Sequence, residues 1–266
     1  MNAVSLKGVS NSGPSENLWA NCPVGDIMAR PGSGVYVYEE FVGNATAATN
    51  QNNVSLGTTG LKCFVSNNAN HTITDAAIQN GGIVLNGDTA DKSTTIAGRV
   101  APLKLDLSEG KLWFEARLKL GSITDNDLNV FVGLSEVYSL TDILPITAAN
   151  ALGDKNQVGF FHVATDGDNW DTTYKADGVA AVNVGTDVKT TVAGTFIKLG
   201  MYFDGTVLSF YVDGVKLADT KTIPSADGTD FPNDVLLAPI VSLANMAGTA
   251  QTVTIDWIAY AQARVA

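Results

Sequence analysis

The clearest sign of the fold is in residues 196–218, "FIKLGMYFDGTVLSFYVDGVKLA". In residues 197–204 apolar side chains alternate with polar or small ones, as expected for a strand with one buried face. The same alternation returns in residues 208–212, and an Asp-Gly pair follows each run, at 204–205 and 213–214. Asp-Gly supplies the positive φ angles that two-residue hairpin turns need. The stretch therefore predicts an antiparallel meander.

The flanking sequence extends this strand pattern in both directions. "LWFEARLKL" (112–120) alternates as a strand with one buried and one solvated face, whereas "LNVFVGLS" (128–135) and "QVGFFHVAT" (157–165) are apolar on both faces and indicate central strands. Further strands are expected at 34–43, 61–66, 81–87, 93–106, 235–244 and 251–262. About a dozen strands at this spacing predict an all-β protein, a two-sheet antiparallel jelly-roll sandwich.

Two segments depart from the strand pattern. Residues 1–33 are rich in Ser, Asn, Gly and Pro and have neither helical nor strand periodicity, which predicts an extended N-terminal arm ahead of a sandwich domain at 34–266. Apolar residues scattered in the arm are the expected anchors of an interface with a neighbouring subunit: Leu18, Trp19, Ile27 and Met28. Residues 140–153, with Pro145 in the middle, predict one short helix or an irregular insertion.

The net charge and the lengths of the apolar stretches argue against nucleic acid and membrane as partners. The chain has 266 residues and a formal net charge of −11, which disfavours a partner held through phosphates, so no nucleic acid is expected. The most apolar stretch, residues 235–248, is too short and too interrupted to span a bilayer, so no membrane is expected either.

Four motifs together resemble a known superfamily: "KLWFEARLKL" (111–120), "VFVGLSE" (130–136), the hairpin at 202–214 and "TVTIDWIAYAQ" (252–262). They resemble the concanavalin-A-like lectin/glucanase superfamily, whose jelly roll is shared by laminin-G domains, legume lectins and one class of β-glucanases. The resemblance covers roughly residues 81–262. More narrowly, these strands with "ATDGDNWD" (164–171) resemble virion proteins of tailed bacteriophages.

The resemblance implies a test for catalysis. The glucanases of this superfamily carry E-x-D-x-E on one strand of the concave face, whereas none of the six glutamates here is followed by x-D-x-E. Glu115 is flanked at two-residue spacing by Trp113 and Arg117, which indicates a surface ion pair. His162 shares a strand face with Phe160 and indicates a buried, hydrogen-bonded histidine. We therefore expect no enzymatic activity and no catalytic residue.

One loop is a candidate metal site. Asp166, Asp168 and Asp171 lie close together in sequence, and such crowded carboxylates suit Ca²⁺. The EF-hand pattern is not followed, because Trp170 stands at a ligand position and no distal glutamate occurs. The alternative is ordinary turn chemistry. Apart from calcium, no cofactor is expected.

Carbohydrate binding without catalysis needs an exposed aromatic platform with polar neighbours. The candidates are Trp113, Trp170, Tyr174 and Tyr202. Each of these rings could instead be buried under a second layer or against a neighbouring subunit.

The resemblance and these tests lead to a functional expectation. The chain is expected to be a non-enzymatic virion structural protein, a capsid decoration or cement protein of a tailed bacteriophage. Its partners would be the major capsid protein, other virion proteins and further copies of itself, on the capsid surface after synthesis in the host cytoplasm. The alternative is a lectin-like adhesion module on a phage head or tail fibre, with a glycan as partner.

Overall fold

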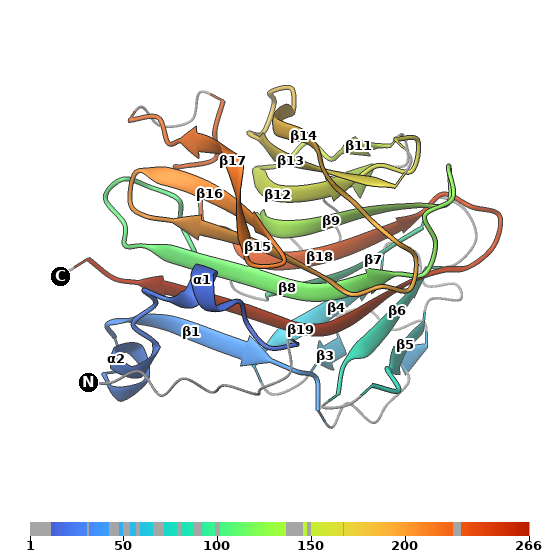
Figure 1. Ribbon diagram of the computed structural model, residues 1–266, viewed down its shortest axis with the longest axis horizontal. Helices are drawn as coiled ribbons and strands as arrows, with labels where there is room; N and C mark the ends of the chain where they lie inside the picture. Colours follow the sequence, from blue (N-terminus) through green and yellow to red (C-terminus); the bar gives the residue numbers. More distant parts are fainter. Residues whose placement is uncertain are drawn as a thin grey trace.

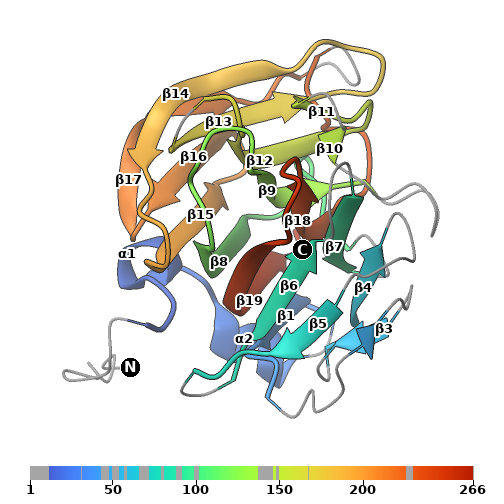
Figure 2. The same ribbon diagram turned by 90° about the vertical axis from the view of Figure 1, so that its right-hand side faces the viewer.

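The fold is a sandwich of two antiparallel sheets, as the alternation predicts, and Figures 1 and 2 show its two layers. A computed structural model describes residues 12–30, 32–42, 48–49, 54–56, 59–65, 72–78, 81–87, 92–98, 102–136, 146–147, 150–166, 168–225 and 230–265.

The nine-stranded sheet contains the meander predicted from residues 196–218. Its strands are, in order, β17 (Val215–Thr222), β16 (Val207–Val212), β15 (Ile197–Phe203), β8 (Leu112–Leu120), β19 (Gln251–Ala263), β6 (Ile83–Gly87), β5 (Thr72–Asp75) and β2 (Ala48–Thr49), and β1 (Gly34–Glu39) also pairs with β19. Gly205, Asp213 and Gly214 have φ angles of 104°, 51° and 78°, as the hairpin turns require.

The eight-stranded sheet carries the strands that are apolar on both faces. Its order is β14 (Val182–Thr190), β13 (Asn169–Lys175), β12 (Gln157–His162), β9 (Leu128–Ser135), β18 (Ala238–Asn245), β7 (Lys92–Gly98), β4 (Leu61–Val65) and β3 (Val54–Leu56). Every residue of β9, β12 and β18 is buried, which confirms the prediction of central strands for 128–135 and 157–165.

The core lies between the two sheets and is built from alternate residues of their strands. Phe160 of β12 and Phe210 of β16 meet edge to face with ring centroids 5.6 Å apart, and both are completely buried. Trp170, Phe114 and Leu134 belong to the same cluster. Burying each such side chain stabilises the folded state by about 1.5–3 kcal/mol, which makes apolar burial the main stabilising contribution.

A pair of glycines brings two central strands of the eight-stranded sheet into close contact. Gly133 of β9 is opposite Gly159 of β12, and a Cβ atom on Gly159 would lie 2.2 Å from the main-chain oxygen of Val132 and 2.8 Å from the Cα atom of Gly133. Neither neighbour is a flexible side-chain end, so a side chain at 159 would force the strands apart.

Gly159→Ala should therefore destabilise the protein by about 1–3 kcal/mol, the usual effect of overpacking a close-packed region. Gly25→Ala is the matched control, since apart from the adjacent residues and the backbone of its own helix no atom lies within 4 Å of a Cβ atom at that position. It should leave the free energy of unfolding unchanged or raise it by less than about 1 kcal/mol. Urea denaturation measures both variants, and equal effects would contradict the close approach of the strands.

The outer face of the eight-stranded sheet is partly covered by a small hairpin. Strands β10 (Ile146–Thr147) and β11 (Ala151–Leu152) pair with each other, and Ile146 and Leu152 join Phe131, Phe161 and Ile240 in a separate apolar cluster. Of the two alternatives predicted for 140–153, a short helix or an irregular insertion, the helix is not present at 146–147 and 151–152, which are extended. Proline at 145 disfavours a helix in this region. Residues 140–145 and 148–149 lie outside the described residues.

Within the predicted N-terminal arm, residues 12–30 are packed against the sandwich. Residues 12–30, here called the docked segment, contain two short helices, α1 (Glu16–Trp19) and α2 (Val24–Ala29), which lie on the outer face of the nine-stranded sheet (Figure 1). This differs from the extended arm predicted for 1–33, and residues 1–11 and 31 lie outside the described residues. The sequence of the segment shows no helical periodicity because its two helices have only four and six residues. Among the described residues, no helix is long and apolar enough to cross a membrane.

Candidate functional site

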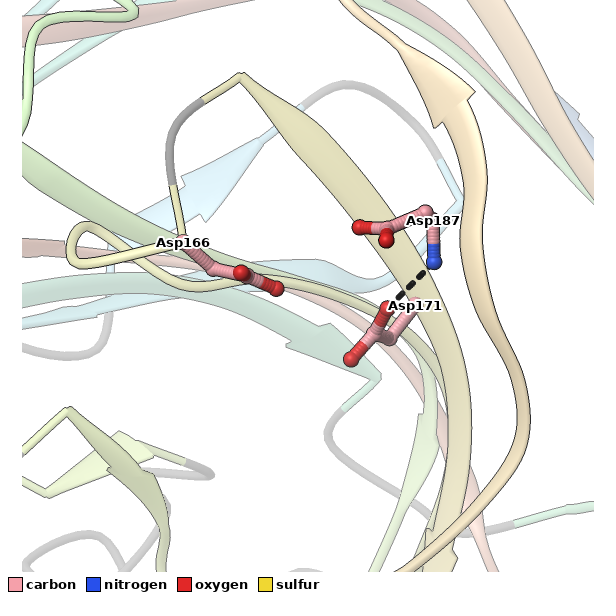
Figure 3. A group of neighbouring side chains, drawn as sticks. All are labelled: Asp166, Asp171 and Asp187. Atoms are coloured by element: carbon pink, nitrogen blue, oxygen red, sulfur yellow. Dashed lines mark hydrogen bonds between the residues drawn. The ribbon is translucent and has the colours of Figure 1, made fainter.

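Three aspartates, one from a loop and two from neighbouring strands, converge at one end of the eight-stranded sheet. Asp166 follows β12, Asp171 belongs to β13 and Asp187 belongs to β14. One carboxylate oxygen from each lies within 4.8 Å of the others, and Figure 3 shows the three side chains grouped around a common space. We call these three residues the carboxylate cluster.

Asp171 is the buried member of the cluster, and its orientation is fixed by hydrogen bonds. Its Oδ1 atom accepts a hydrogen bond from the main-chain N–H of Asp187 at 2.8 Å, and its Oδ2 atom accepts one from Nδ2 of Asn183 at 2.7 Å. Asp187 has a φ of 51°, and this left-handed conformation turns its amide toward Asp171 within the irregular β13–β14 pairing.

The electrostatics of the cluster favour a cation. Burial raises the pKa of Asp171, and the negative charges of Asp166 and Asp187 raise it further, while the two hydrogen bonds act in the opposite direction. None of the ion pairs between described residues involves a member of the cluster. Three carboxyl groups therefore lie close together, and no described side chain forms an ion pair with any of them.

The donor set fits Ca²⁺. Calcium takes six to eight oxygen ligands at about 2.3–2.6 Å, so two of its ligands can be up to roughly 5 Å apart. The separations within the cluster stay inside this limit. Asp166 and Asp187 are exposed, so their oxygens can be reached from solvent.

The surroundings of the cluster are polar on one side and apolar on the other. Asn169 and Thr190 are paired across β13 and β14, and Oγ1 of Thr190 donates a 2.9 Å hydrogen bond to Oδ1 of Asn169. On the other side Phe161, opposite Asp171 in the register, is covered by the β10–β11 hairpin. The polar edge formed by β13 and β14 is thus the accessible side of the cluster.

The structure changes one member of the predicted metal site. Asp166 and Asp171 are brought together as expected, but Asp168 is not part of the cluster, and its main-chain oxygen accepts a hydrogen bond from Thr191. Asp187 takes its place. Sequence reasoning missed Asp187 because it lies sixteen residues beyond Asp171, on the neighbouring strand. The one sequence feature that pointed to Asp187 was its position just after Gly185 and Thr186, in a strand where apolar and polar residues alternate only weakly.

The raised pKa of Asp171 predicts how stability depends on pH in the calcium-free protein. A carboxyl group whose pKa is raised by folding stabilises the fold below its unfolded pKa of about 3.9, and this contribution is lost as the pH rises through the raised value. The free energy of unfolding of the wild type, relative to Asp171→Asn, should therefore fall as the pH rises from about 4 toward 7. Denaturant titrations in EDTA measure this difference. A difference that does not vary with pH would contradict the argument.

The predicted aromatic platform is not exposed. Trp113 and Trp170 are 1% and 0% exposed, and Tyr174 is also buried. Trp170 and Tyr174 point into the core between the sheets, whereas Trp113 lies beneath the docked segment with its ring 5.4 Å from that of half-buried Tyr202. These side chains therefore cannot form the solvated platform expected from the sequence.

The predicted anchors of the arm contact their own sandwich. Leu18 and Ile27 are buried in a cluster with Trp113 and Tyr211, and the ring of Trp19 meets that of Tyr36 edge to face at 6.2 Å. Met28 is the exception, with 68% of its surface exposed. Of the four predicted anchors, Met28 is thus the one whose side chain is largely exposed and can contact a neighbouring subunit.

Two further side chains were interpreted from the sequence: the prediction for Glu115 is wrong, and the prediction for His162 is confirmed. Glu115 is 0% exposed rather than paired at the surface with Arg117, whose guanidinium instead binds Asp256 and lies over the ring of Phe196 at 4.0 Å. His162 is buried, with Nδ1 3.3 Å from the oxygen of Leu128, as predicted for a structural histidine. Burial lowers its pKa.

Comparisons with known proteins identify the fold. No protein-family model and no curated protein matches the sequence. A solved structure of a protein of unknown function from Shewanella oneidensis MR-1 matches with a TM-score of 0.57 at 14% identity, covering 87% of each chain. Peanut lectin matches with a TM-score of 0.53 at 12% identity, covering 88% of this chain and 99% of the lectin.

The chain therefore has the concanavalin-A-like jelly-roll fold, as the resemblance implies.

A third match corrects the expectation that the chain is not an enzyme. A protein from a study of endo-acting O-glycanases of the human gut microbiota that initiate mucin breakdown has a TM-score of 0.53 at 10% identity, covering 84% of this chain and 97% of that protein. Because glycan-cleaving enzymes share this sandwich, the lack of E-x-D-x-E rules out only one arrangement of catalytic carboxylates. Proteins with this fold thus include both carbohydrate-binding and glycan-cleaving members.

Proposed function

We propose that the protein recognises carbohydrate at the carboxylate cluster, with calcium as the ion that the cluster holds. The proposal rests on the convergence of Asp166 from the β12–β13 loop with Asp171 of β13 and Asp187 of β14 at the accessible edge of the eight-stranded sheet. The fold, shared with peanut lectin and an O-glycanase, supports carbohydrate as the ligand class.

Asp166, Asp171 and Asp187 would bind the ion through their carboxylate oxygens. A bound calcium ion supplies coordination positions that sugar hydroxyl oxygens can occupy. The chain itself fixes the geometry, because the hydrogen bonds from Asn183 and the Asp187 amide hold the Asp171 carboxylate in one orientation. Rigid ligands of this kind reduce the ordering cost of binding.

Polar neighbours of the cluster can provide the remaining contacts to sugar hydroxyls. Asn169 and Thr190 lie on the same edge, two residues from Asp171 and three from Asp187. Amide and hydroxyl groups both donate and accept hydrogen bonds, which matches the hydroxyl groups of a saccharide. The edge thus combines charged oxygens with neutral hydrogen-bonding groups, without an exposed aromatic ring among the described residues.

The experiment is a glycan-binding screen of the full chain in calcium and in EDTA. Binding of a saccharide class in calcium, lost in EDTA and in Asp171→Asn, is the expected result. An assay for new reducing ends on each bound glycan then separates a binding protein from a glycan-cleaving enzyme. Binding that is the same in calcium and in EDTA would contradict the role of the cluster.

A further inference from the structure

The outer face of the nine-stranded sheet holds a buried carboxylate whose hydrogen-bond donors come from the docked segment. Oε2 of Glu115 accepts hydrogen bonds from the main-chain N–H of Ser15 and from Nε1 of Trp19, both at 2.9 Å, and Oε1 accepts one from Oγ of Ser15. A carboxylate that is taken out of water must regain such partners. Ser15 and Trp19 are thus the polar anchors of the docked segment.

Two glycines shape the same face to fit the segment. A Cβ atom on Gly200 of β15 would lie 2.5 Å from Cδ2 of Leu18, and one on Gly214 would lie 3.0 Å from Cβ of Ser15. Leu18, which is 2% exposed, fills the space above Gly200. Any larger residue at 200 would displace it.

Main-chain groups of the segment are recognised as well. Nε1 of Trp257 donates a 2.6 Å hydrogen bond to the oxygen of Ser12, and Nζ of Lys198 donates one of 3.3 Å to the oxygen of Gly13. Nδ2 of Asn17 donates in the other direction, to the oxygen of Gly214 at 3.4 Å. The face therefore contacts the segment at several points from residue 12 to residue 19.

These contacts are separate from the core of the sandwich. Leu18, Ile27, Trp113 and Tyr211 form a cluster of their own, distinct from the one between the sheets. Detachment of the segment would therefore break contacts of this outer cluster and not those of the inter-sheet core. Opening by such local units is a general property of proteins.

We propose that this face, formed by Trp113, Glu115, Gly200, Tyr211 and Trp257, is a peptide-recognition site for residues 12–22. It takes that segment from a second copy of the chain as well as from its own. Each contact is made by a side chain or main-chain group that an incoming segment reproduces, so exchange between copies loses none of them. The chain's own segment has the advantage of high effective concentration, so exchange requires high local protein density.

The test uses a fluorescent peptide of residues 12–22 and the full chain carrying Leu18→Ala and Trp19→Ala. These substitutions weaken the chain's own segment and leave the face intact. The wild-type peptide should bind this variant with saturation, and bind the wild-type chain at least about tenfold more weakly because of intramolecular competition. The peptide with Leu18→Ala should lose most of its binding. No binding by the wild-type peptide, or equal binding by both peptides, would overturn the proposal.

Hydrogen exchange on the wild-type chain gives a second test that needs no variant. The amides of Trp19, Cys22 and Ile27 donate within the docked segment. They should exchange faster than the amides of β8 and β19, by opening of the segment alone. Exchange of these amides only with global unfolding would show that the segment cannot leave, and would overturn the proposal even if the variant chain failed to fold.

Discussion

Replacement of Trp170 by alanine is expected to lower the free energy of unfolding by about 3–5 kcal/mol, the usual cost of removing a buried tryptophan. The ring is completely buried, belongs to the inter-sheet core and meets the ring of His162 at a centroid distance of 5.4 Å. Its removal leaves a cavity in the apolar core between the two sheets. Urea denaturation monitored by circular dichroism measures the loss.

Val192→Ala is the control for this variant, because Val192 is exposed just beyond β14 and should change stability by less than about 0.5 kcal/mol. Trp170 as a core residue and Trp170 as an exposed sugar-stacking ring predict opposite effects of the alanine substitution. A ring exposed for stacking on sugar would leave the unfolding transition unchanged and remove only glycan binding. That outcome would contradict the buried position of the ring.

Replacement of Asp187 by asparagine is expected to weaken calcium binding about 100-fold, because affinity of calcium sites follows the number of charged ligands. The backbone should tolerate the change, since asparagine readily adopts the left-handed conformation found at this position. The hydrogen bond from residue 187 to Asp171 comes from the main chain and is retained. Isothermal titration calorimetry with CaCl₂ measures the affinity.

Asp168→Asn is the matched control, because it removes the same charge from the same region of the protein. The carboxylate of Asp168 is outside the cluster, and its hydrogen bond with Thr191 uses the main-chain oxygen, so the affinity should change by less than about threefold. Equal losses in Asp168→Asn and Asp187→Asn would indicate a general electrostatic effect. Such a result would contradict a site built from residues 166, 171 and 187.

The sheets of the sandwich could be predicted from sequence because their signals are local. Alternation in 112–120 and 197–203, and the Asp-Gly pair at 213–214, determine strand and turn within a few residues. The central position of β9 and β12 also followed from residues that are apolar on both faces.

The predictions that were wrong concern features that depend on contacts between segments distant in sequence. The face of β8 that carries Trp113 and Glu115 has the pattern of a solvated face, and the docked segment, about a hundred residues earlier in sequence, buries it. Asp187 could not be assigned to the cluster because the irregular pairing of β13 and β14 decides which residue lies beside Asp171. Attachment to a virion stays a prediction.

The most direct test of the central claim is glycan binding by the full chain, measured on an array with calcium and again with EDTA. We expect binding to a defined class of saccharide in calcium, absent in EDTA and in Asp171→Asn, and retained in Asp168→Asn. An array without any signal in calcium, or one whose signals survive both EDTA and Asp171→Asn, would contradict it.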